Sequence, residues 1–331
     1  MSCPRIPISI ITPTWNGLPY IQECVESVLS QCHREFELLI SDDVSSDETR
    51  KYLQTINDPR VRVFYQESNL GIFGNLNFLF TQATYPISYI LCQDDALRPG
   101  GLSHVVRTWS EQAADVAWIR FNFWDVTTQA CSLTRFQQSA LPRCIEPENA
   151  DLYFFVFGNI LGNLSNNSIR TPLVSQAGYF NQSFPYAGDF EFWIRLAKLG
   201  KLVILDDHVV NVRSHPRQAS FLLNRKGELI PQLYSIVDNL YSRLKTQYSP
   251  SLLRKHAARY YDSPHLKIGF QQLVMAGRRE YLMQIGRASH DVSCFPNAWN
   301  RFLECVLTLG GRCNKLWTGQ RLLAGDAKVE K

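Results

Sequence analysis

The stretch Ile8–Asp43 reads ISIITPTWNGLPYIQECVESVLSQCHREFELLISDD, and its pattern decides the fold. It opens with the apolar run Ile8–Ile11, continues with apolar residues at helical spacing, and closes with a second apolar run, Leu38–Ile40. Pro19 suits the first helical position, because the N–H that proline lacks has no partner there. The two runs are apolar on both faces, as strands of a helix-covered parallel sheet must be. The stretch therefore predicts a strand, a helix and a parallel strand.

The same alternation continues to about residue 116. Helical spacing is found in Asn75–Ala83 and Leu102–Trp109, and Asp47 can cap a further helix. Strand–helix alternation predicts an α/β fold with a doubly wound, mainly parallel sheet, helices on both faces and right-handed crossovers. Ligands bind such a sheet at the carboxyl ends of its strands. The five expected strands begin near Ile8, Phe36, Val61, Ile87 and Val116.

The length of 331 residues predicts more than one structural part, since single cores seldom grow past roughly 250 residues. We expect three parts: residues 1–112 as the first half of a catalytic domain, 113–220 as the second half, and 221–331 as a C-terminal helical region. The middle part is less regular and rich in aromatic residues, and it is expected to build the second half of a cleft. The last part carries apolar residues at helical spacing from Leu233 to Leu244.

Charge is distributed unevenly along the chain. Residues 1–220 carry 17 Lys and Arg against 22 Asp and Glu, while residues 221–331 carry 17 against 8, a net charge of +9. The basic region is expected either to face an anionic partner, such as a membrane surface, or to be a solvated basic face without one. No nucleic-acid partner is expected.

Several features predict a cytoplasmic protein that at most touches the inner face of a membrane. The nine cysteines are odd in number and form no C-x-x-C pair, which is typical of reduced thiols. No signal peptide is evident at the N-terminus. The longest apolar runs, such as Tyr153–Phe157 and Leu202–Leu205, are far shorter than the roughly 18 residues of a spanning helix.

Polar clusters follow three of the expected strands. They are Thr12–Gly17 after the first strand, Asp42–Asp47 after the second and Gln93–Asp95 after the fourth. Each alone could be a solvated turn, but clusters at the carboxyl ends of neighbouring parallel strands converge on one crevice. Their joint placement therefore predicts a binding site.

The acidic pairs suggest two kinds of chemistry. Adjacent carboxylates repel one another unless a cation or a donor offsets the charge, and Mg²⁺ or Mn²⁺ bound with diphosphate oxygens does so. Such an ion would stabilise the charge that builds on a departing diphosphate. A carboxylate of the pair Asp42 and Asp43 would instead accept hydrogen bonds from a nucleobase, and Trp15 offers a surface on which the base can stack.

Four segments taken together, PTWNG, ISDDVSSDET, NLGIFGNLN and CQDDALRP, resemble the nucleotide-binding half of family 2 glycosyltransferases with the GT-A fold. The resemblance covers residues 6 to about 100. It implies that Asp94 ligates the metal with Asp95 beside it, although Cys92 stands where the first acid of the family motif often is. The implied contacts to the nucleotide sugar are Thr12, Pro13, Trp15, Asn16, Asp43, Asn69, Gly71, Asn77, Gln93 and Asp94.

The second half adds two motifs to the resemblance. In GDFEFWIRLAKLGK, Asp189 aligns with the catalytic base of the family, Glu191 is the alternative, and we expect the helix to run past Leu199 to Gly200. Without catalysis, Asp189 would simply be an acid stabilised by a helix N-terminus. In VRSHPRQAS, similar to the R-x-H-x-x-x-x-S segment of relatives, His215 is expected either to approach the metal or to be an ordinary exposed loop histidine.

The predicted function is inverting transfer of one sugar from a UDP- or dTDP-linked donor to a glycan or lipid-linked glycan acceptor, in surface polysaccharide synthesis. The expected cofactor is Mn²⁺ or Mg²⁺. A dehydrogenase would need G-x-G-x-x-G after the first strand, which is absent. Polymer-forming relatives carry Q-x-x-R-W and transmembrane helices, and neither is found. The alternatives left open are a catalytically weak nucleotide-sugar-binding protein and a nucleotidyltransferase-like enzyme.

Overall fold

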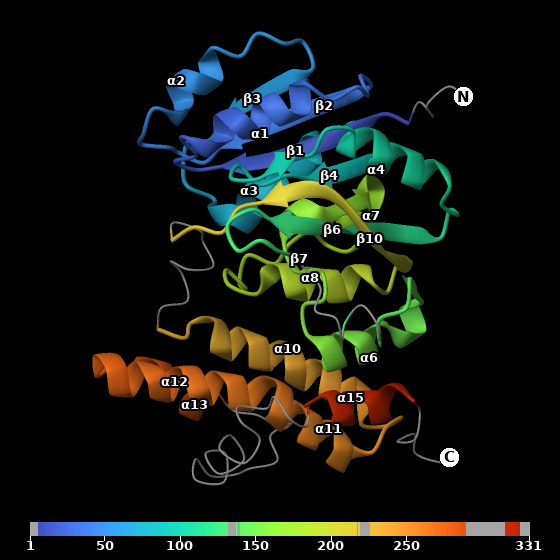
Figure 1. Ribbon diagram of the computed structural model, residues 1–331, viewed down its shortest axis with the longest axis vertical. Helices are drawn as coiled ribbons and strands as arrows, with labels where there is room; N and C mark the ends of the chain where they lie inside the picture. Colours follow the sequence, from blue (N-terminus) through green and yellow to red (C-terminus); the bar gives the residue numbers. More distant parts are fainter. Residues whose placement is uncertain are drawn as a thin grey trace. The chain divides into compact units, whose positions relative to one another are not determined.

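The computed structural model describes residues 6–131, 137, 140–216, 218, 226–288 and 315–324. The chain divides into two compact units, which are treated separately below. The first contains Met1–Pro147 and Leu161–His215, and the second contains Glu148–Ile160 and Pro216–Lys331 (Figure 1). Residues 148–160, which fall inside the expected middle part 113–220, are therefore grouped with the C-terminal helices.

The first unit is built on one mixed sheet with the strand order β3-β2-β1-β4-β9-β6-β10-β5. Strands β1 to β4 pair in parallel, and β10 pairs in parallel with β6, while β9 lies antiparallel between β4 and β6. Its strands are β1 (Ile8–Thr14), β2 (Phe36–Asp42), β3 (Val61–Tyr65), β4 (Ile87–Ile90), β5 (Ala96–Leu97), β6 (Val116–Asp125), β7 (Ala130–Cys131), β8 (Cys144–Ile145), β9 (Asn167–Arg170) and β10 (Lys201–Val212). The expected doubly wound, mainly parallel sheet is confirmed, and all five expected strand starts are correct.

Helices cover both faces of this sheet. Ile8 and Ile10 face one core cluster, which also contains the apolar sides of α1, α2 and α4. Side chains alternate along a strand, so Ile11 faces the other side, where α3 packs against β1 and β2. The helices of the unit are α1 (Tyr20–Leu29), α2 (Thr49–Gln54), α3 (Gly71–Gln82), α4 (Gly101–Ser110), α7 (Thr171–Gln176), α8 (Gly188–Leu196) and the short 3₁₀ turn η1 (Leu164–Asn166).

An aromatic stack joins α3 to α8. The ring of Phe180 lies 5.3 Å from that of Phe73 in α3 and 4.1 Å from that of Phe192 in α8, measured between centroids. Trp193 in turn stacks on Trp118 of β6 at 6.2 Å. Such large buried rings fix the orientation of α8, because each buries much apolar area in a specific geometry.

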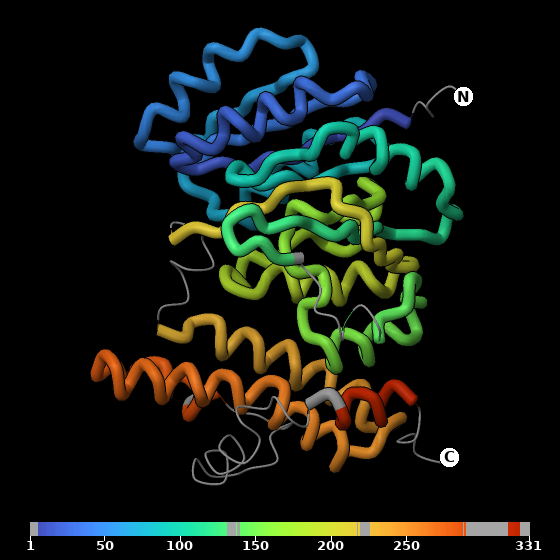
Figure 2. The backbone as a smooth tube through the Cα atoms, in the orientation of Figure 1, coloured from blue at the N-terminus to red at the C-terminus, as the bar shows by residue number. Residues whose placement is uncertain are grey.

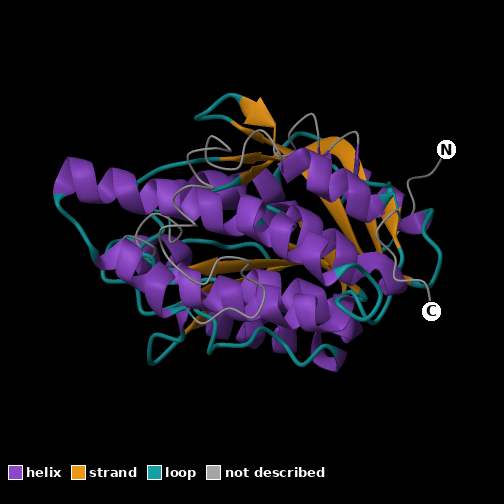
Figure 3. Ribbon diagram, turned by 90° about the horizontal axis from the view of Figure 1, so that it is seen from below, coloured by secondary structure: helices purple, strands orange, loops and turns teal. Residues whose placement is uncertain are grey.

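The described residues of the second unit form helices and no strand. Figure 3 distinguishes the helices and strands of the chain by colour. The expected apolar stripe of α10 is buried at Ile236, Val237, Leu240 and Leu244, while Leu233 at its start is only half-buried. Among the described residues, no helix has both the length and the apolar character that crossing a membrane requires. The helices are α6 (Pro147–Phe157), α10 (Leu229–Leu244), α11 (Pro250–Ala257), the π-helical turn η2 (Ala258–Asp262), α12 (Ser263–Ala276), α13 (Glu280–Arg287) and α15 (Lys315–Leu323).

A buried histidine gives the second unit a predictable response to acid. Burial lowers the pKa of His265 to about 4, and its Nδ1 lies 2.7 Å from the hydroxyl of Tyr281. An unfolded histidine titrates near about 6.5, so between these values the unfolded chain binds a proton that the folded chain does not. Stability should therefore fall as the pH is lowered through this window, by up to about 1.4 kcal/mol per pH unit.

Urea unfolding of the wild type and of His265→Gln at a series of pH values checks this expectation. The variant cannot take up the proton, so its free energy of unfolding should depend less steeply on pH. Equal slopes for the two proteins would show that His265 does not cause the effect.

Candidate active site

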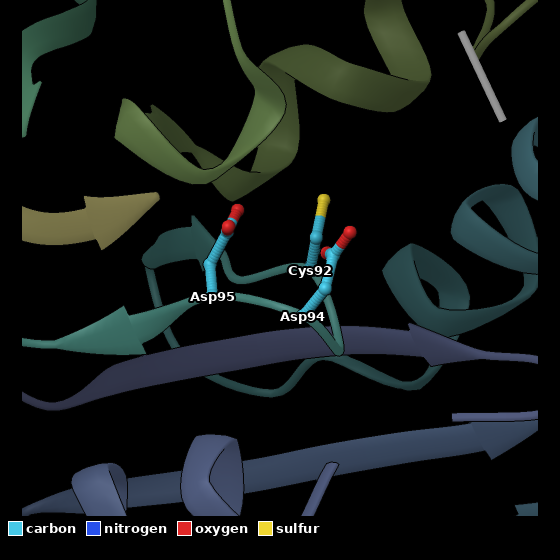
Figure 4. Close-up of side chains that lie close together, drawn as sticks. All are labelled: Cys92, Asp94 and Asp95. Atoms are coloured by element: carbon cyan, nitrogen blue, oxygen red, sulfur yellow. The ribbon is translucent and has the colours of Figure 1, made fainter. Parts of the chain in front are cut away.

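The central element of the site is the loop between β4 and β5, which we call the acidic loop (Cys92–Asp95). The side chains of Cys92, Asp94 and Asp95 point to the same side of the loop (Figure 4). One ligand atom from each lies within 4.8 Å of the others. The structure thus places the two acids of this loop close together, and their role as a metal site stays a prediction.

Burial raises the pKa of two of the three side chains. Burial, followed by the charge of Asp94, raises the pKa of the Asp95 carboxyl well above its ordinary value. Burial likewise raises the pKa of the Cys92 thiol, so this sulfur stays protonated. A neutral thiol is a poor ligand for Mg²⁺ or Mn²⁺, which prefer oxygen. The oxygen atoms of Asp94 and Asp95 suit such an ion better than the Cys92 sulfur does.

The segment after β10 closes over the acidic loop. Nε2 of His215 lies 3.0 Å from Oδ2 of Asp94. The backbone N–H of Arg213 donates to Oδ1 of Asp95 at 3.0 Å, and its guanidinium donates to the carbonyl of Asp94 at 3.2 Å. The structure thus brings His215 to Asp94, the residue that the resemblance assigns to the metal. Ser220, the last residue of that motif, lies outside the described residues.

Helix α1 holds this segment in place. The ring of Tyr20 lies between two groups, with the Arg213 guanidinium 4.7 Å from its centroid and the His215 ring 4.8 Å away. Arg213 also forms an ion pair with Glu23 at 2.7 Å. Stacking and charge together restrict the side chains that flank Asp94.

The predicted stacking residue Trp15 sits on a loop tied to the acidic loop through Gln93. The side-chain oxygen of Gln93 accepts from the Thr14 hydroxyl and from the Trp15 N–H, and its amide donates to the Trp15 carbonyl. The Trp15 side chain remains 50% exposed and so can offer its face to a ligand. Gly17 is required beside it, because an added Cβ would lie 2.6 Å from the Thr14 hydroxyl oxygen.

Asn16 connects the loops that follow β1 and β2. It adopts a left-handed backbone (φ 48°), which asparagine tolerates, and its side-chain oxygen accepts from the Ser46 N–H at 2.8 Å. In the second loop Val44 has φ 62°, a strained conformation for a β-branched residue. Asn16 therefore has a structural role in the site, whether or not it contacts a ligand.

Asp43 is oriented by the start of α3. Its two carboxylate oxygens accept from the N–H groups of Leu70 (2.7 Å) and Gly71 (3.0 Å), and Asn69 donates to its carbonyl. Burial raises the pKa of the Asp43 carboxyl. Each oxygen of a carboxylate can accept a further bond, so these contacts leave room for a ligand donor. Asp42 differs, since it is buried in an ion pair with Arg50 at 2.5 Å.

Three predicted ligand contacts have side chains that are either buried or paired within the protein. Thr12 is fully buried and Pro13 is buried, both within β1. The Asn77 amide is paired with the backbone of Phe180, donating to its carbonyl and accepting from its N–H. These positions support the framework of the site, and their direct contact with a ligand remains a prediction that their packing disfavours.

The two candidate bases differ in the hydrogen bonds that their carboxylates form. Asp189 is half-buried in the first turn of α8, where its Oδ1 accepts from the Phe190 N–H at 2.7 Å. Glu191 binds Arg195 through both oxygens at 2.7 Å, and Arg195 also donates to the Ala177 and Tyr179 carbonyls. Glu191 is thus held by Arg195, and which of the two acids acts as the base stays a prediction. The expected extent of the helix was wrong, because α8 ends at Leu196 and Leu199 is 39% exposed.

Close packing at Gly188 fixes the start of α8. A Cβ added there would lie 2.7 Å from the ring of Phe73. Gly188→Ala should therefore lower the free energy of unfolding by about 1–3 kcal/mol, measured by urea denaturation. The matched control is Gly286→Ala, since an added Cβ would meet nothing within 4 Å there. An alanine at Gly188 that is tolerated as well as the one at Gly286 would contradict this account.

Two contributors to the site were not singled out from the sequence. Arg213 stands in the quoted VRSHPRQAS motif and could have been chosen from it. Ser165 accepts from the Cys92 N–H at 2.8 Å, and its carbonyl accepts from the Tyr89 hydroxyl. No local sequence signal marks Ser165, because its contacts join parts of the chain more than 70 residues apart.

The residues of the acidic loop fit a divalent cation. Oδ2 of Asp95 is buried and has no hydrogen bond of normal geometry among the described residues, and the same holds for Nδ1 of His215. A buried acceptor without a partner costs free energy, and an adjacent like charge adds to that cost. Asp94, Asp95 and His215 offer carboxylate and imidazole ligands, which suit Mn²⁺ and, for the carboxylates, Mg²⁺.

Comparisons with known proteins agree with this geometry. Residues 9–165 match the family described as glycosyl transferase family 2. The chain is 25% identical over 231 residues to an uncharacterized glycosyltransferase of Haemophilus influenzae, covering 68% of this chain and 70% of the relative. It is 25% identical over 194 residues to the GalNAc(5)-diNAcBac-PP-undecaprenol beta-1,3-glucosyltransferase of Campylobacter jejuni, covering 58% of this chain and 60% of the relative.

Solved structures share the fold across nearly the whole chain. S. aureus TarS 1–349, solved with UDP, has a TM-score of 0.62 at 16% identity, covering 96% of this chain and 90% of that one. The mannosyltransferase PcManGT of Pyrobaculum calidifontis, solved with GDP-Man and Mn²⁺, has a TM-score of 0.53 at 17% identity, with 97% and 86% covered.

The sheet, the loops at its carboxyl edge and these likenesses define a glycosyltransferase with the GT-A fold. The match to glycosyl transferase family 2 covers just under half of the chain, so residues 9–165 are similar to that family.

Proposed function

We propose that this enzyme transfers one sugar from a nucleoside-diphosphate donor, of the UDP or dTDP type, to a glycan acceptor. The observation that carries the proposal is the clustering of Asp94 and Asp95 in the acidic loop, with Nε2 of His215 3.0 Å from Oδ2 of Asp94. These residues would hold Mn²⁺ or Mg²⁺, which when bound supplies charge stabilisation for a diphosphate leaving group. Exposed Trp15 would stack on the base, and Asp43 would bind its polar edge.

Residues of the chain itself perform the remaining steps. Asp189 accepts the proton of the acceptor hydroxyl while that oxygen attacks the anomeric carbon. Direct attack opposite the leaving group inverts the anomeric configuration and needs no covalent intermediate. The division of labour that we propose assigns the donor to residues 1–112 and the acceptor to 113–220.

The acceptor is proposed to be a lipid-linked glycan of surface polysaccharide synthesis at the inner face of the membrane. Support comes from the printed activity of the Campylobacter relative, which acts on an undecaprenol-linked glycan. The match spans 60% of that relative, and 38% of a Rickettsia felis relative, so the acceptor is inferred from part of each protein. The net charge of +9 in residues 221–331 suits an anionic membrane surface.

A thermal-shift screen of nucleoside diphosphates, each with Mn²⁺ and with EDTA, tests the donor assignment. A pyrimidine nucleotide should raise the melting temperature, and Mn²⁺ should enlarge the shift, because ligands that bind the folded state stabilise it. A protein stabilised equally by all nucleotides, or equally in EDTA, would not be the enzyme proposed here. Release of nucleoside diphosphate over time then separates a catalyst from a binding protein.

A further inference from the structure

The turn between α12 and α13 presents an apolar pair to solvent. Val274 is 82% exposed and Met275 is 85% exposed, more than any other large apolar side chain among the described residues. The helix ends directly after them at Gly277, which has φ 63°. The turn lies at the outer end of the orange helix pair (Figure 2). We call Val274, Met275, Arg278 and Arg279 the hairpin tip.

Packing within the helix pair explains why the tip stays exposed. Gly269 of α12 lies against Leu282 and Tyr281 of α13, and Leu266 is buried nearby in α12. This contact joins the helices one or two turns before the tip. Val274 and Met275 therefore add nothing to the core of the unit. Their contact with water is unfavourable in free energy, and no packing within the unit offsets it.

Cations accompany the apolar pair. Arg278 and Arg279 follow at once and are both exposed, and Lys267 is exposed earlier on α12. Helix α12 contains no acidic residue, and Glu280 is the one acid of the turn. Exposed Ile268 continues the apolar surface, because it lies seven residues before Met275 and thus on the same side of the helix.

Exposed apolar side chains next to exposed arginines are suited to binding an anionic bilayer. Apolar side chains enter the boundary between headgroups and acyl chains, while neighbouring arginines bind lipid phosphates. An acidic protein surface would satisfy Arg278 and Arg279 but leave Val274 and Met275 without an apolar environment. Lipid satisfies both, and it agrees with the net charge of +9 in this part of the sequence.

We propose that the hairpin tip docks the enzyme on an anionic membrane, with Val274 and Met275 inserted and Arg278 and Arg279 at lipid phosphates. The inference deepens the proposed function and rests on it for the lipid-linked acceptor. Insertion of a short tip gives reversible attachment, so that an enzyme could move from one membrane-bound acceptor to the next.

Flotation with vesicles tests the proposal on the full chain. Wild type should bind vesicles of equal parts phosphatidylglycerol and phosphatidylcholine, and bind phosphatidylcholine alone more weakly. The double variant Val274→Ser/Met275→Ser should lose at least about tenfold in partitioning. Arg278→Gln/Arg279→Gln should lose about tenfold on the anionic vesicles only.

Matched controls show whether vesicle binding depends on the hairpin tip or on exposed apolar and basic side chains in general. Leu199→Ser removes an exposed apolar side chain of the other unit, and Arg254→Gln/Lys255→Gln removes two exposed cations from α11. Both should bind vesicles as wild type does. The proposal is overturned if the tip variants bind normally, if the controls lose as much, or if the Val274/Met275 variant changes only the oligomeric state, which would identify the tip as a contact between copies.

Titration of UDP with Mn²⁺ into the same variants separates this inference from the proposed function. The tip variants should bind the nucleotide as wild type does. Normal nucleotide binding without vesicle binding overturns only the docking proposal. Tip-dependent vesicle binding without any nucleotide binding supports docking and overturns the donor assignment.

Discussion

Asp94→Ala is expected to abolish the metal dependence of the enzyme and to lower glycosyl transfer by roughly 10²-fold or more, since metal stabilisation of a leaving group supplies several kcal/mol and each 1.36 kcal/mol is tenfold in rate. Asp94 faces His215 at 3.0 Å and lies within the ligand cluster of the acidic loop. Release of nucleoside diphosphate, measured with Mn²⁺ and with EDTA, reports both effects.

Cys92→Ser provides the matched control for Asp94→Ala. Its sulfur belongs to the same cluster, but burial keeps the thiol protonated and so a poor ligand for a hard cation. The serine variant should keep Mn²⁺-dependent activity within a fewfold of wild type. Full activity of Asp94→Ala in EDTA, or loss of metal dependence in Cys92→Ser alone, would show that the ligands were misassigned.

Asp189→Asn is expected to reduce turnover by roughly 10²-fold or more, because general base catalysis contributes 10²–10⁴-fold. The asparagine keeps the side-chain oxygen that accepts from the Phe190 N–H at 2.7 Å, so the helix start should be preserved. Nucleotide affinity and the free energy of unfolding should therefore barely change. Turnover and urea unfolding of the same preparation measure the two effects separately.

Glu191→Gln is the control for the base assignment. Glu191 holds Arg195 through two hydrogen bonds of 2.7 Å, so its substitution should cost about 1 kcal/mol or more of stability and little turnover. The reverse result, with turnover lost in Glu191→Gln and kept in Asp189→Asn, would move the base to Glu191. If Asp189 only stabilised the helix N-terminus, its variant would lose stability by up to about 1 kcal/mol and remain active.

Much of the fold could be predicted because its signals are local. An apolar run flanked by helical spacing defines a strand such as Ile8–Thr14 without knowledge of its partners. The antiparallel insertion of β9 between β4 and β6 could not be read, since strand pairing depends on contacts distant in sequence. The end of α8 was misplaced for a related reason. A Cβ added at Gly200 would lie 2.6 Å from the Asp115 carbonyl oxygen. This glycine, which was interpreted as a helix end, therefore allows the backbone to lie close to another segment.

The candidate site also combines features with a local sequence signal and features that depend on distant contacts. Acids at strand ends were predicted from position, and the structure clusters Asp94 with Asp95 and places His215 at Asp94. The sequence could not show that Asn77 pairs with the backbone of Phe180 across 103 positions, or that Arg213 anchors the acidic loop across 118. Such side-chain contacts to distant backbone groups decide which polar residues remain available to a ligand.

The most direct test of the central claim is calorimetric titration of UDP into wild type and Asp94→Asn, each with Mn²⁺ and with EDTA. Mn²⁺ should strengthen UDP binding to the wild type by at least about tenfold, or about 1.4 kcal/mol, and should have little effect on the variant. Asparagine keeps the shape of the side chain at the acidic loop while removing the charge that binds the cation. Equal strengthening by Mn²⁺ in both proteins, or none in the wild type, would contradict the account.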